Sequence, residues 1–194
     1  MATRVVIADD DVITRLDIRE ALEYQGYDVV GEAADGIDAV ELCQNLNPDA
    51  VLLDVKMPVM DGLTAARLIN SDQKNIAIIM LTAYNDKQFV DKAAEFGAQG
   101  YLVKPIDEKS LIPTIEIAIK RVTELAELKV SVEEQERKLQ ERKLIEKAKG
   151  ILMKNNTISE DEAYKYLRSI SMNKRKSIAE VAKIIVDTES ILHQ

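Results

Sequence analysis

The sequence predicts an α/β protein with a five-stranded, parallel, doubly wound sheet, followed by one long helix and a small three-helix, all-α domain. From Arg4 to Lys104, short apolar runs alternate with amphipathic stretches, a pattern typical of a parallel sheet covered by helices on both faces. After Lys104 the alternation stops and helical periodicity continues nearly to the end of the chain. The chain has 194 residues, enough for two small domains.

Each element of the sheet domain follows from its apolar pattern. Gly26 and Gly97 stand where helix ends need a residue with positive φ, which supports the boundaries beside them. The expected strands are Val5 to Ala8, Asp28 to Ala33, Ala50 to Asp54, Ile76 to Thr82 and Gly100 to Lys104. The expected helices between them are Val12 to Gln25, Ile37 to Leu46, Leu63 to Ser71 and Lys87 to Phe96.

Charged and hydroxyl side chains follow the predicted strands. Asp9 and Asp10 follow the first strand, Asp54 ends the third, Thr82 the fourth and Lys104 the fifth. Parallel strands place their carboxyl ends at one crevice, so these side chains should meet. Three neighbouring carboxylates raise one another's pKa values unless a cation lies among them, and hard oxygen ligands favour Mg²⁺. With Lys104 and Thr82 nearby to bind phosphate oxygens, the pattern predicts a phosphoryl acceptor.

The turn after Asp54 supports this assignment. Val51, Leu52 and Leu53 form an uninterrupted apolar run, as expected for a strand buried on both faces. Pro58 and the Asp-Gly pair at 61–62 then predict a loop before the next helix. Asp54 therefore stands at the carboxyl end of a buried strand, where open α/β sheets bind ligands.

Four motifs in residues 1–120 resemble the receiver domain of bacterial two-component response regulators: the acidic pair at 9–10, LLDVKMPVMDG, LTAYND and GAQGYLVKP. The resemblance implies a flavodoxin-like strand order 2-1-3-4-5 and a phosphoacceptor with at most slow Mg²⁺-dependent self-phosphorylation and autodephosphorylation. Asp54 would be phosphorylated by a sensor histidine kinase. Its implied site residues are Asp9, Asp10, Asp54 and the Lys56 carbonyl for Mg²⁺, with Thr82 and Tyr101 as the switch pair and Lys104 on the phosphate.

The one histidine and the one cysteine of the chain are not expected to take part in phosphoryl transfer. The only histidine, His193, is the penultimate residue in a tail expected to fray, so the phosphodonor should be another protein. The only cysteine, Cys43, recurs with Val40 and Leu46 at helical spacing and is expected to be a packed core thiol.

Helical periodicity after Lys104 predicts one long helix, and its residues 121–140 are expected to form a linker. Pro113 fits only a first helical turn, which suggests a helix start nearer Pro113 than Asp107. Coiled-coil spacing then continues for about two heptads. A solvated linker helix is the alternative, because the seam is short and includes a glutamine. The seam consists of Leu125, Leu128, Val132, Gln135 and Leu139.

Residues 141–194 predict the three-helix domain. Ser159 with Glu162, and Ser177 with Glu180, are capping boxes that place helices at Glu160 to Ile170 and Ile178 to Ser190, joined by residues 173–176. Gly150, in the apolar stripe of the preceding helix, would permit close helix packing. The pieces AKGILM, SEDEAYKYLR and IAEVAKII resemble the ANTAR domain, an RNA-binding antitermination module fused to receivers, from about residue 133 to 192. The architecture is similar to that of the ethanolamine-utilisation antiterminators.

The charge distribution agrees with a polyanion partner at the C-terminal end. The net charge is −8, yet residues 1–120 carry −10 and residues 141–176 carry +5. Only Tyr164 and Tyr166 are aromatic beyond residue 120, which favours recognition of RNA shape and backbone over base stacking. The candidate RNA-binding residues are Lys147, Lys149, Arg168, Lys174, Arg175 and Lys176.

These features predict a phosphorylation-controlled antiterminator that dimerises when phosphorylated and binds hairpin RNA in leader transcripts. A DNA-binding regulator is one alternative, although the last helix carries Glu180, Asp187 and Glu189 against Lys183 alone. A protein-interaction output without nucleic acid is the other. No apolar run approaches the roughly 18 residues of a membrane span, and no signal peptide begins the chain, so we expect no membrane association and a cytoplasmic location.

Overall fold

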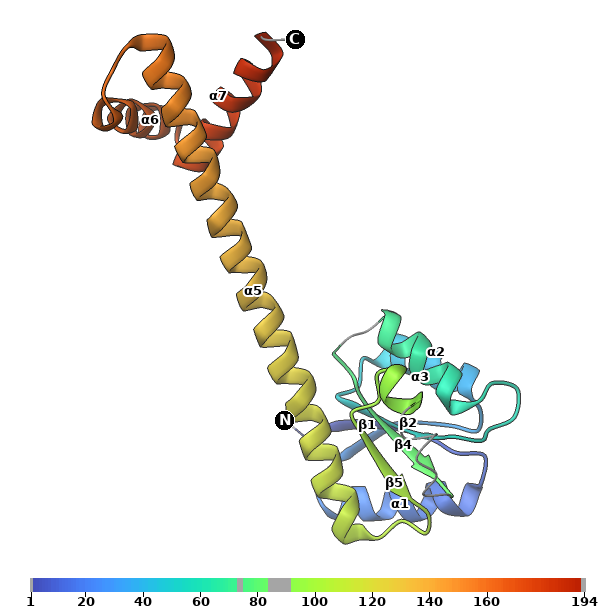
Figure 1. The fold of residues 1–194 in the computed structure, drawn as a ribbon. Helices are drawn as coiled ribbons and strands as arrows, with labels where there is room; N and C mark the ends of the chain where they lie inside the picture. Colours follow the sequence, from blue (N-terminus) through green and yellow to red (C-terminus); the bar gives the residue numbers. More distant parts are fainter. Residues whose placement is uncertain (1, 73–74, 84–91, 193–194) are drawn as a thin grey trace. The chain divides into compact units, whose positions relative to one another are not determined.

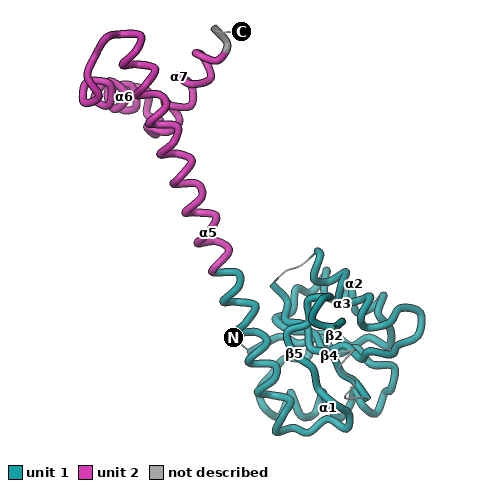
Figure 2. The backbone as a smooth tube through the Cα atoms, viewed as in Figure 1, with its two compact units in different colours: residues 1–127 teal, residues 128–194 magenta. Residues whose placement is uncertain are grey.

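The computed structural model describes residues 2–72, 75–83 and 92–192, in two compact units, Met1–Glu127 and Leu128–Gln194 (Figure 2). Helix α5 belongs to both units, because the division falls within it. In the part of the chain that is described, no helix is long and apolar enough to cross a membrane.

The first unit is built on the predicted sheet. Its strands are β1 (Arg4–Ala8), β2 (Asp28–Ala33), β3 (Ala50–Asp54), β4 (Ala77–Thr82) and β5 (Gly100–Val103). All described pairings are parallel and the order is β2-β1-β3-β4-β5, which confirms the predicted fold (Figure 1). Ala8 of β1 pairs with Leu53 of β3, so the residues that follow, Asp9 and Asp54, emerge side by side.

Two helical layers cover the sheet. Helices α2 (Gly36–Leu46) and α3 (Gly62–Asp72) pack on one face with Val51 and Leu53. Helix α1 (Val12–Tyr24) and the start of α5 pack on the other with Leu52. Residues 92–95 are helical, whereas the rest of the predicted helix Lys87 to Phe96 lies largely outside the described residues. Cys43 is buried in the α2 layer and its pKa is raised by burial to about 12, consistent with an inert core thiol.

Helix α5 (Glu108–Asn156) begins earlier than the position of Pro113 suggested. The Asp107 carbonyl accepts the Leu111 N–H at 3.1 Å, and Leu111 and Ile115 are buried on either side of the proline. Pro113 removes only the bond to the carbonyl of Lys109, an exposed position where water can replace it. Burial of the two apolar residues therefore holds the helix through the proline.

The second unit packs the end of α5 against α6 (Glu160–Lys174) and α7 (Ile178–Leu192). Both predicted capping boxes are formed: Glu162 accepts the Ser159 N–H, Glu180 accepts the Ser177 N–H, and each serine Oγ accepts the glutamate N–H in return. Helix α6 extends past the predicted Ile170, and the connection shortens to residues 175–177, because Arg175 adopts a left-handed φ of 53° and caps α6. Its core residues include Ala148, Leu152, Ala163, Leu167, Val181, Ala182 and Val186.

Candidate functional site

Asp54 is held at the end of β3 by a turn that only glycine permits. Its side chain is buried, and the residue is 6% exposed. The Lys56 N–H donates to Asp54 Oδ2 at 3.2 Å, and the Gly62 N–H donates to the Val55 carbonyl at 3.1 Å. A Cβ at Gly62 would lie 1.9 Å from the Asp54 carbonyl oxygen, so any side chain there would displace the turn. The Asp-Gly pair of the sequence is thus a packing requirement of the site.

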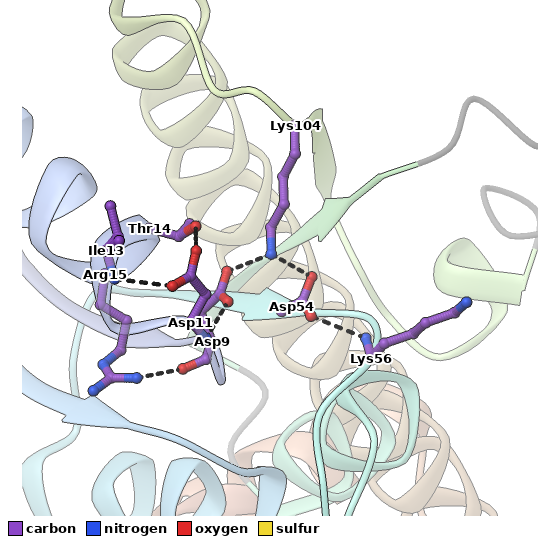
Figure 3. A network of polar contacts seen from close by, with 8 residues as sticks. All are labelled: Asp9, Asp11, Ile13, Thr14, Arg15, Asp54, Lys56 and Lys104. Carbon is purple, nitrogen blue, oxygen red and sulfur yellow. Dashed lines mark hydrogen bonds and ion pairs between the residues drawn. The ribbon is translucent and has the colours of Figure 1, made fainter.

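Lys104 joins two of the predicted carboxylates. Its Nζ lies 2.6 Å from Asp9 Oδ2 and 2.9 Å from Asp54 Oδ1 (Figure 3). The Lys104 N–H donates to the Thr82 carbonyl at 2.8 Å, which fixes the backbone of Lys104 against β4. Residues at the ends of β1, β3 and β5 therefore meet at the Lys104 ammonium group.

The electrostatics leave the carboxylate of Asp54 only partly compensated. Burial raises the pKa of Asp54, the nearby charge of Asp9 raises it further, and the hydrogen bond and charge of Lys104 offset part of this rise. Burial lowers the pKa of Lys104, but its hydrogen bonds to Asp9 and Asp54 outweigh that effect and raise it overall. The site can therefore accept additional positive charge.

Asp9, Asp10 and Asp54 fit a divalent cation. Each offers one carboxylate oxygen, and these oxygens lie within 4.8 Å of one another. Asp9 and Asp54 are buried and Asp10 is exposed, so the cluster has an open side. Hard oxygen ligands with room for water are the arrangement that Mg²⁺ uses when it also binds phosphate oxygens.

A pocket of about 260 Å³ opens beside this cluster. The buried Thr82 borders it, whereas Tyr101 is 47% exposed and lies outside its lining. The side chain of Lys56 points away from Asp54 (Figure 3). The structure thus brings together every predicted receiver residue except Tyr101. The pocket is lined by Asp10, Asp54, Val55, Lys56, Thr82, Ala83 and Lys104.

Sequence reasoning missed the groups that hold Asp9. The Asp11 N–H donates to Asp9 Oδ1 at 3.0 Å, and Arg15 Nη1 donates to the Asp9 carbonyl at 2.7 Å. Asp11 also caps α1, since its Oδ1 accepts the Ile13 N–H at 3.1 Å. An aspartate directly before a helical pattern is a recognisable N-cap signal, whereas nothing local predicts the contact of Arg15.

The candidate RNA-binding residues fall into two groups. Lys147, Arg168 and the basic residues at 174–176 are exposed. Lys149 differs, because it is 8% exposed and its Nζ lies 2.6 Å from Glu160 Oε1 and 2.8 Å from Glu146 Oε1. These two hydrogen bonds raise the pKa of Lys149. The charge of Lys149 is therefore already paired with two glutamates of the same unit.

The two capped helix starts of the second unit are alike in their backbone hydrogen bonds and differ in their flanking charge. At both Ser159 and Ser177 a glutamate already accepts a backbone N–H, so neither start presents its full set of free donors to a phosphate. Glu160, at the first start, is paired with Lys149. The contrast that remains is the basic stretch before Ser177.

Comparison with known proteins identifies both units. Residues 5–116 match the response regulator receiver domain, and residues 133–186 match the ANTAR domain. The chain belongs to the response-regulator family.

The response regulator has relatives along nearly its whole length. It is 42% identical over 186 residues to the transcriptional regulatory protein PdtaR of Mycobacterium tuberculosis, covering 95% of this chain and 90% of the relative. Its first unit is 36% identical to the chemotaxis protein CheY of Treponema pallidum, over 60% of this chain and 83% of CheY.

Solved structures resemble the receiver part. The CheX–CheY complex of Borrelia burgdorferi with BeF₃ and Mg²⁺ matches with a TM-score of 0.56 at 34% identity, over 58% of this chain and 86% of that chain. The receiver domain of the response regulator NarL of Mycobacterium tuberculosis matches with a TM-score of 0.55 at 32% identity, over 65% and 97%.

Family membership settles the coarse function. Receiver domains act as phosphoacceptors rather than enzymes and bind Mg²⁺ at an acidic pocket, and this response regulator carries such a pocket at Asp9, Asp10 and Asp54. Its output domain is an RNA-binding domain of the antitermination type. The predicted family, fold class and kind of output are confirmed.

Proposed function

We propose that a partner sensor histidine kinase phosphorylates Asp54, and that this event controls binding of the ANTAR domain to hairpin RNA in leader transcripts, preventing transcription termination. The observation that carries the proposal is the buried Asp54 carboxylate in a pocket with Lys104 and two further carboxylates. Asp9 shares Lys104 and the cation cluster but does not line the pocket, so among the described carboxylates Asp54 alone combines a strand end, the lysine, the cluster and the pocket.

The geometry supports transfer of a phosphoryl group to Asp54. An Asp54 oxygen would form the new P–O bond as the bond between phosphorus and the kinase's imidazole nitrogen breaks, and the nitrogen keeps the electron pair. Lys104 Nζ, 2.9 Å from Asp54 Oδ1, and the Lys56 N–H would balance the added negative charge. Mg²⁺, held by Asp9, Asp10, Asp54 and the Lys56 carbonyl, would neutralise phosphate charge when bound. Any self-phosphorylation or autodephosphorylation should be slow, because no described histidine or glutamate lines the pocket to activate water.

Residues 121–140 would serve as a coiled-coil linker through which two phosphorylated copies pair. Leu125, Leu128, Val132 and Leu139 are 63%, 62%, 55% and 52% exposed, an apolar seam that a second helix could cover. A seam of about two heptads is marginal alone, so a modest bias from the receiver can shift the monomer–dimer equilibrium. Sedimentation of phosphorylated and unphosphorylated protein at equal concentration tests this step, and unchanged mass would rule it out.

The RNA-binding surface would include Lys147, Arg168 and the basic residues at 174–176, all exposed. The backbone of Arg175 and Lys176 is fixed, because their N–H groups donate to the carbonyls of Met172 and Ser171 at 3.4 Å and 3.1 Å. A fixed basic turn suits recognition of phosphates by position, as in the reading of RNA shape.

The charge of α7 argues against a DNA-binding output. A recognition helix needs basic or polar side chains toward the major groove. The exposed charged residues of α7 are Glu180, Asp187 and Lys183, and the last turn adds Glu189. A duplex would therefore repel this helix.

Electrophoretic mobility shifts with leader transcripts from the same genome test the proposal. We expect phosphorylated protein to retard transcripts that contain paired hairpins and unphosphorylated protein to do so weakly. Equal binding in both states would contradict phosphorylation control. Absence of any RNA binding, with normal phosphorylation, would favour a protein-interaction output.

A further inference from the structure

Gly150 occupies a helical position where the fold itself gives glycine no use. It lies inside α5, six residues before the helix ends at Asn156, and it is exposed. A Cβ built there meets no atom within 4 Å, so the close helix packing expected from the sequence is absent. Glycine in a helix interior costs stability relative to alanine because it loses more backbone freedom on folding. Gly150 therefore serves no packing role within its own unit, and its lack of a side chain points to a contact with a partner molecule.

Unpaired lysines surround this bare backbone. Lys143, Lys147 and Lys154 precede or follow Gly150 by seven, three and four residues, which places all four on one face of the helix. All three lysines are exposed. Among the described residues, no carboxylate forms an ion pair with any of them.

The basic residues earlier on the same helix are arranged differently. Ion pairs with glutamates one turn away engage them, as in Lys120 with Glu124 and Lys138 with Glu134. Lys129 and Arg137 are paired likewise with Glu133 and Glu141. Between residues 122 and 141 every basic residue of α5 is thus ion-paired, whereas beyond Glu141, where the exposed glycine lies, most are not.

Lys149 pairs with two carboxylates near this face that would otherwise oppose an anion more strongly. Glu146 is one turn before Gly150 and would repel a phosphate, but its Oε1 lies 2.8 Å from Lys149 Nζ. The same Nζ binds Glu160 at 2.6 Å. Lys149 therefore offsets part of the negative charge of two carboxylates beside this face.

We propose that the sugar–phosphate backbone of RNA lies directly against α5 at Gly150, between Lys143 and Lys147 on one side and Lys154 on the other. We call residues 143, 147, 150 and 154 the α5 basic face. The absence of a Cβ lets a phosphate approach the helix more closely than any side chain would permit, and the lysines supply the charge. This inference rests on the proposed RNA-binding function and names a contact surface for it on α5.

A second copy of the chain is the other possible occupant of a bare helix face. Charge disfavours it, because two α5 basic faces would bring like-charged lysines together. The apolar seam that suits a second copy ends at Leu139, before this face begins.

The test adds a side chain at Gly150 in the full-length, phosphorylated chain and measures both stability and RNA binding. Gly150→Ala and Gly150→Gln should raise the melting temperature of the second unit, by about 4–8 °C for alanine. Both should weaken binding of a hairpin RNA that the wild type retards, about tenfold for alanine and more for glutamine. Ser169→Gln, at an exposed position of α6, is the matched control and should leave affinity unchanged.

Lys147→Gln and Lys154→Gln should each reduce the slope of log K against log salt by about 0.7 to 0.9, the loss expected for one phosphate contact. Gly150 variants that are more stable and bind RNA as tightly as the wild type would overturn this inference while leaving RNA binding intact. A binding defect that disappears at high protein concentration, together with weaker dimerisation in sedimentation, would overturn it in favour of a second copy. If the wild-type chain retards no RNA, the proposed function itself fails.

Discussion

Two lysines of this response regulator each bridge two carboxylates, yet their surroundings are inverted. Lys104 Nζ lies 2.6 Å and 2.9 Å from Asp9 and Asp54, and Lys149 Nζ lies 2.6 Å and 2.8 Å from Glu160 and Glu146. In the receiver the acids are buried, with side chains 0% and 9% exposed, and the lysine is 23% exposed. In the second unit the lysine is 10% exposed and the acids are 57% and 65% exposed.

This inversion separates a ligand site from a structural ion pair. Buried carboxylates have lost their hydration, and one lysine cannot compensate two of them, so such a cluster gains from a further cation. Exposed carboxylates keep much of their hydration, and pairing with a lysine leaves no demand for another ligand. Which member of the triad is buried therefore indicates function better than the distances do.

The largest expected effect comes from changing Asp54. The comparison predicts that this change abolishes phosphorylation, whereas a change in the triad of the second unit does not affect it. Asp54→Asn should abolish labelling by acetyl phosphate with Mg²⁺, because the acceptor oxygen is removed. Glu160→Gln, which alters the other triad, should label as the wild type does. The measurement is a gel that retards phosphorylated protein. Full labelling of Asp54→Asn would place the acceptor elsewhere.

The next effect contrasts paired with unpaired basic residues. Changing Lys174, Arg175 and Lys176 together to alanine should weaken binding of all cognate hairpins and lower the slope of log K against log salt by about two to three, because three phosphate contacts are lost. Lys149→Gln removes no phosphate contact, so the slope should stay within about half a unit of the wild-type value, while affinity should fall because Glu146 and Glu160 lose their shared cation. Titrations at four salt concentrations measure both slopes. An unchanged slope in the triple variant would move the phosphate contacts away from this turn.

A smaller effect concerns Lys104 and depends on metal. Lys104→Ala leaves Asp9 and Asp54 facing each other without their cation, so the free energy of unfolding should fall by about 1–3 kcal/mol in the presence of a chelator. Millimolar Mg²⁺ should recover much of this loss by binding the same carboxylates. Urea unfolding followed by circular dichroism measures it.

The corresponding change in the second unit provides the control. Lys149→Ala should also destabilise the chain, but Mg²⁺ should not reduce that deficit, because Glu146 and Glu160 are exposed and hydrated. Equal responses of both variants to Mg²⁺ would contradict the distinction between a ligand site and a structural pair.

The receiver site was predictable because its signals are local and periodic. The alternation of apolar strands and amphipathic helices predicts a parallel sheet, and that alone places Asp9, Asp54 and Lys104 at one edge of it. The capping boxes at Ser159 and Ser177 are likewise written in four consecutive residues, and both formed. Such features need no knowledge of distant contacts.

What the sequence did not predict depends on contacts between elements. The burial of Lys149 requires Glu160, a residue of the next helix, and no pattern within α5 indicates that pair. The open surface over Gly150 follows from how α6 and α7 pack on the opposite side of α5. The early start of α5 likewise depends on burial of Leu111 and Ile115 against the sheet.

The smallest effect is the pH dependence of the pair between Lys149 and Glu160. The hydrogen bond from Lys149 lowers the pKa of Glu160, so the stability that this group contributes is present above its ordinary pKa of 4.5 and is lost as pH falls through its lower pKa in the folded chain. Wild type should therefore melt at a higher temperature than Glu160→Gln at pH 7, and the two should converge on acidification below that value. At the alkaline end the pKa of Lys149 is raised, so the difference should persist up to the ordinary lysine value of 10.5. Glu136→Gln, at an exposed carboxylate without a described ion pair, is the control for the loss of one charge. Melting followed by circular dichroism between pH 3 and pH 7 measures all three proteins at roughly unit intervals. A gap between wild type and Glu160→Gln that stays constant to the acidic end would mean that the glutamine disturbs packing at the start of α6, and the charge of the pair would then contribute nothing.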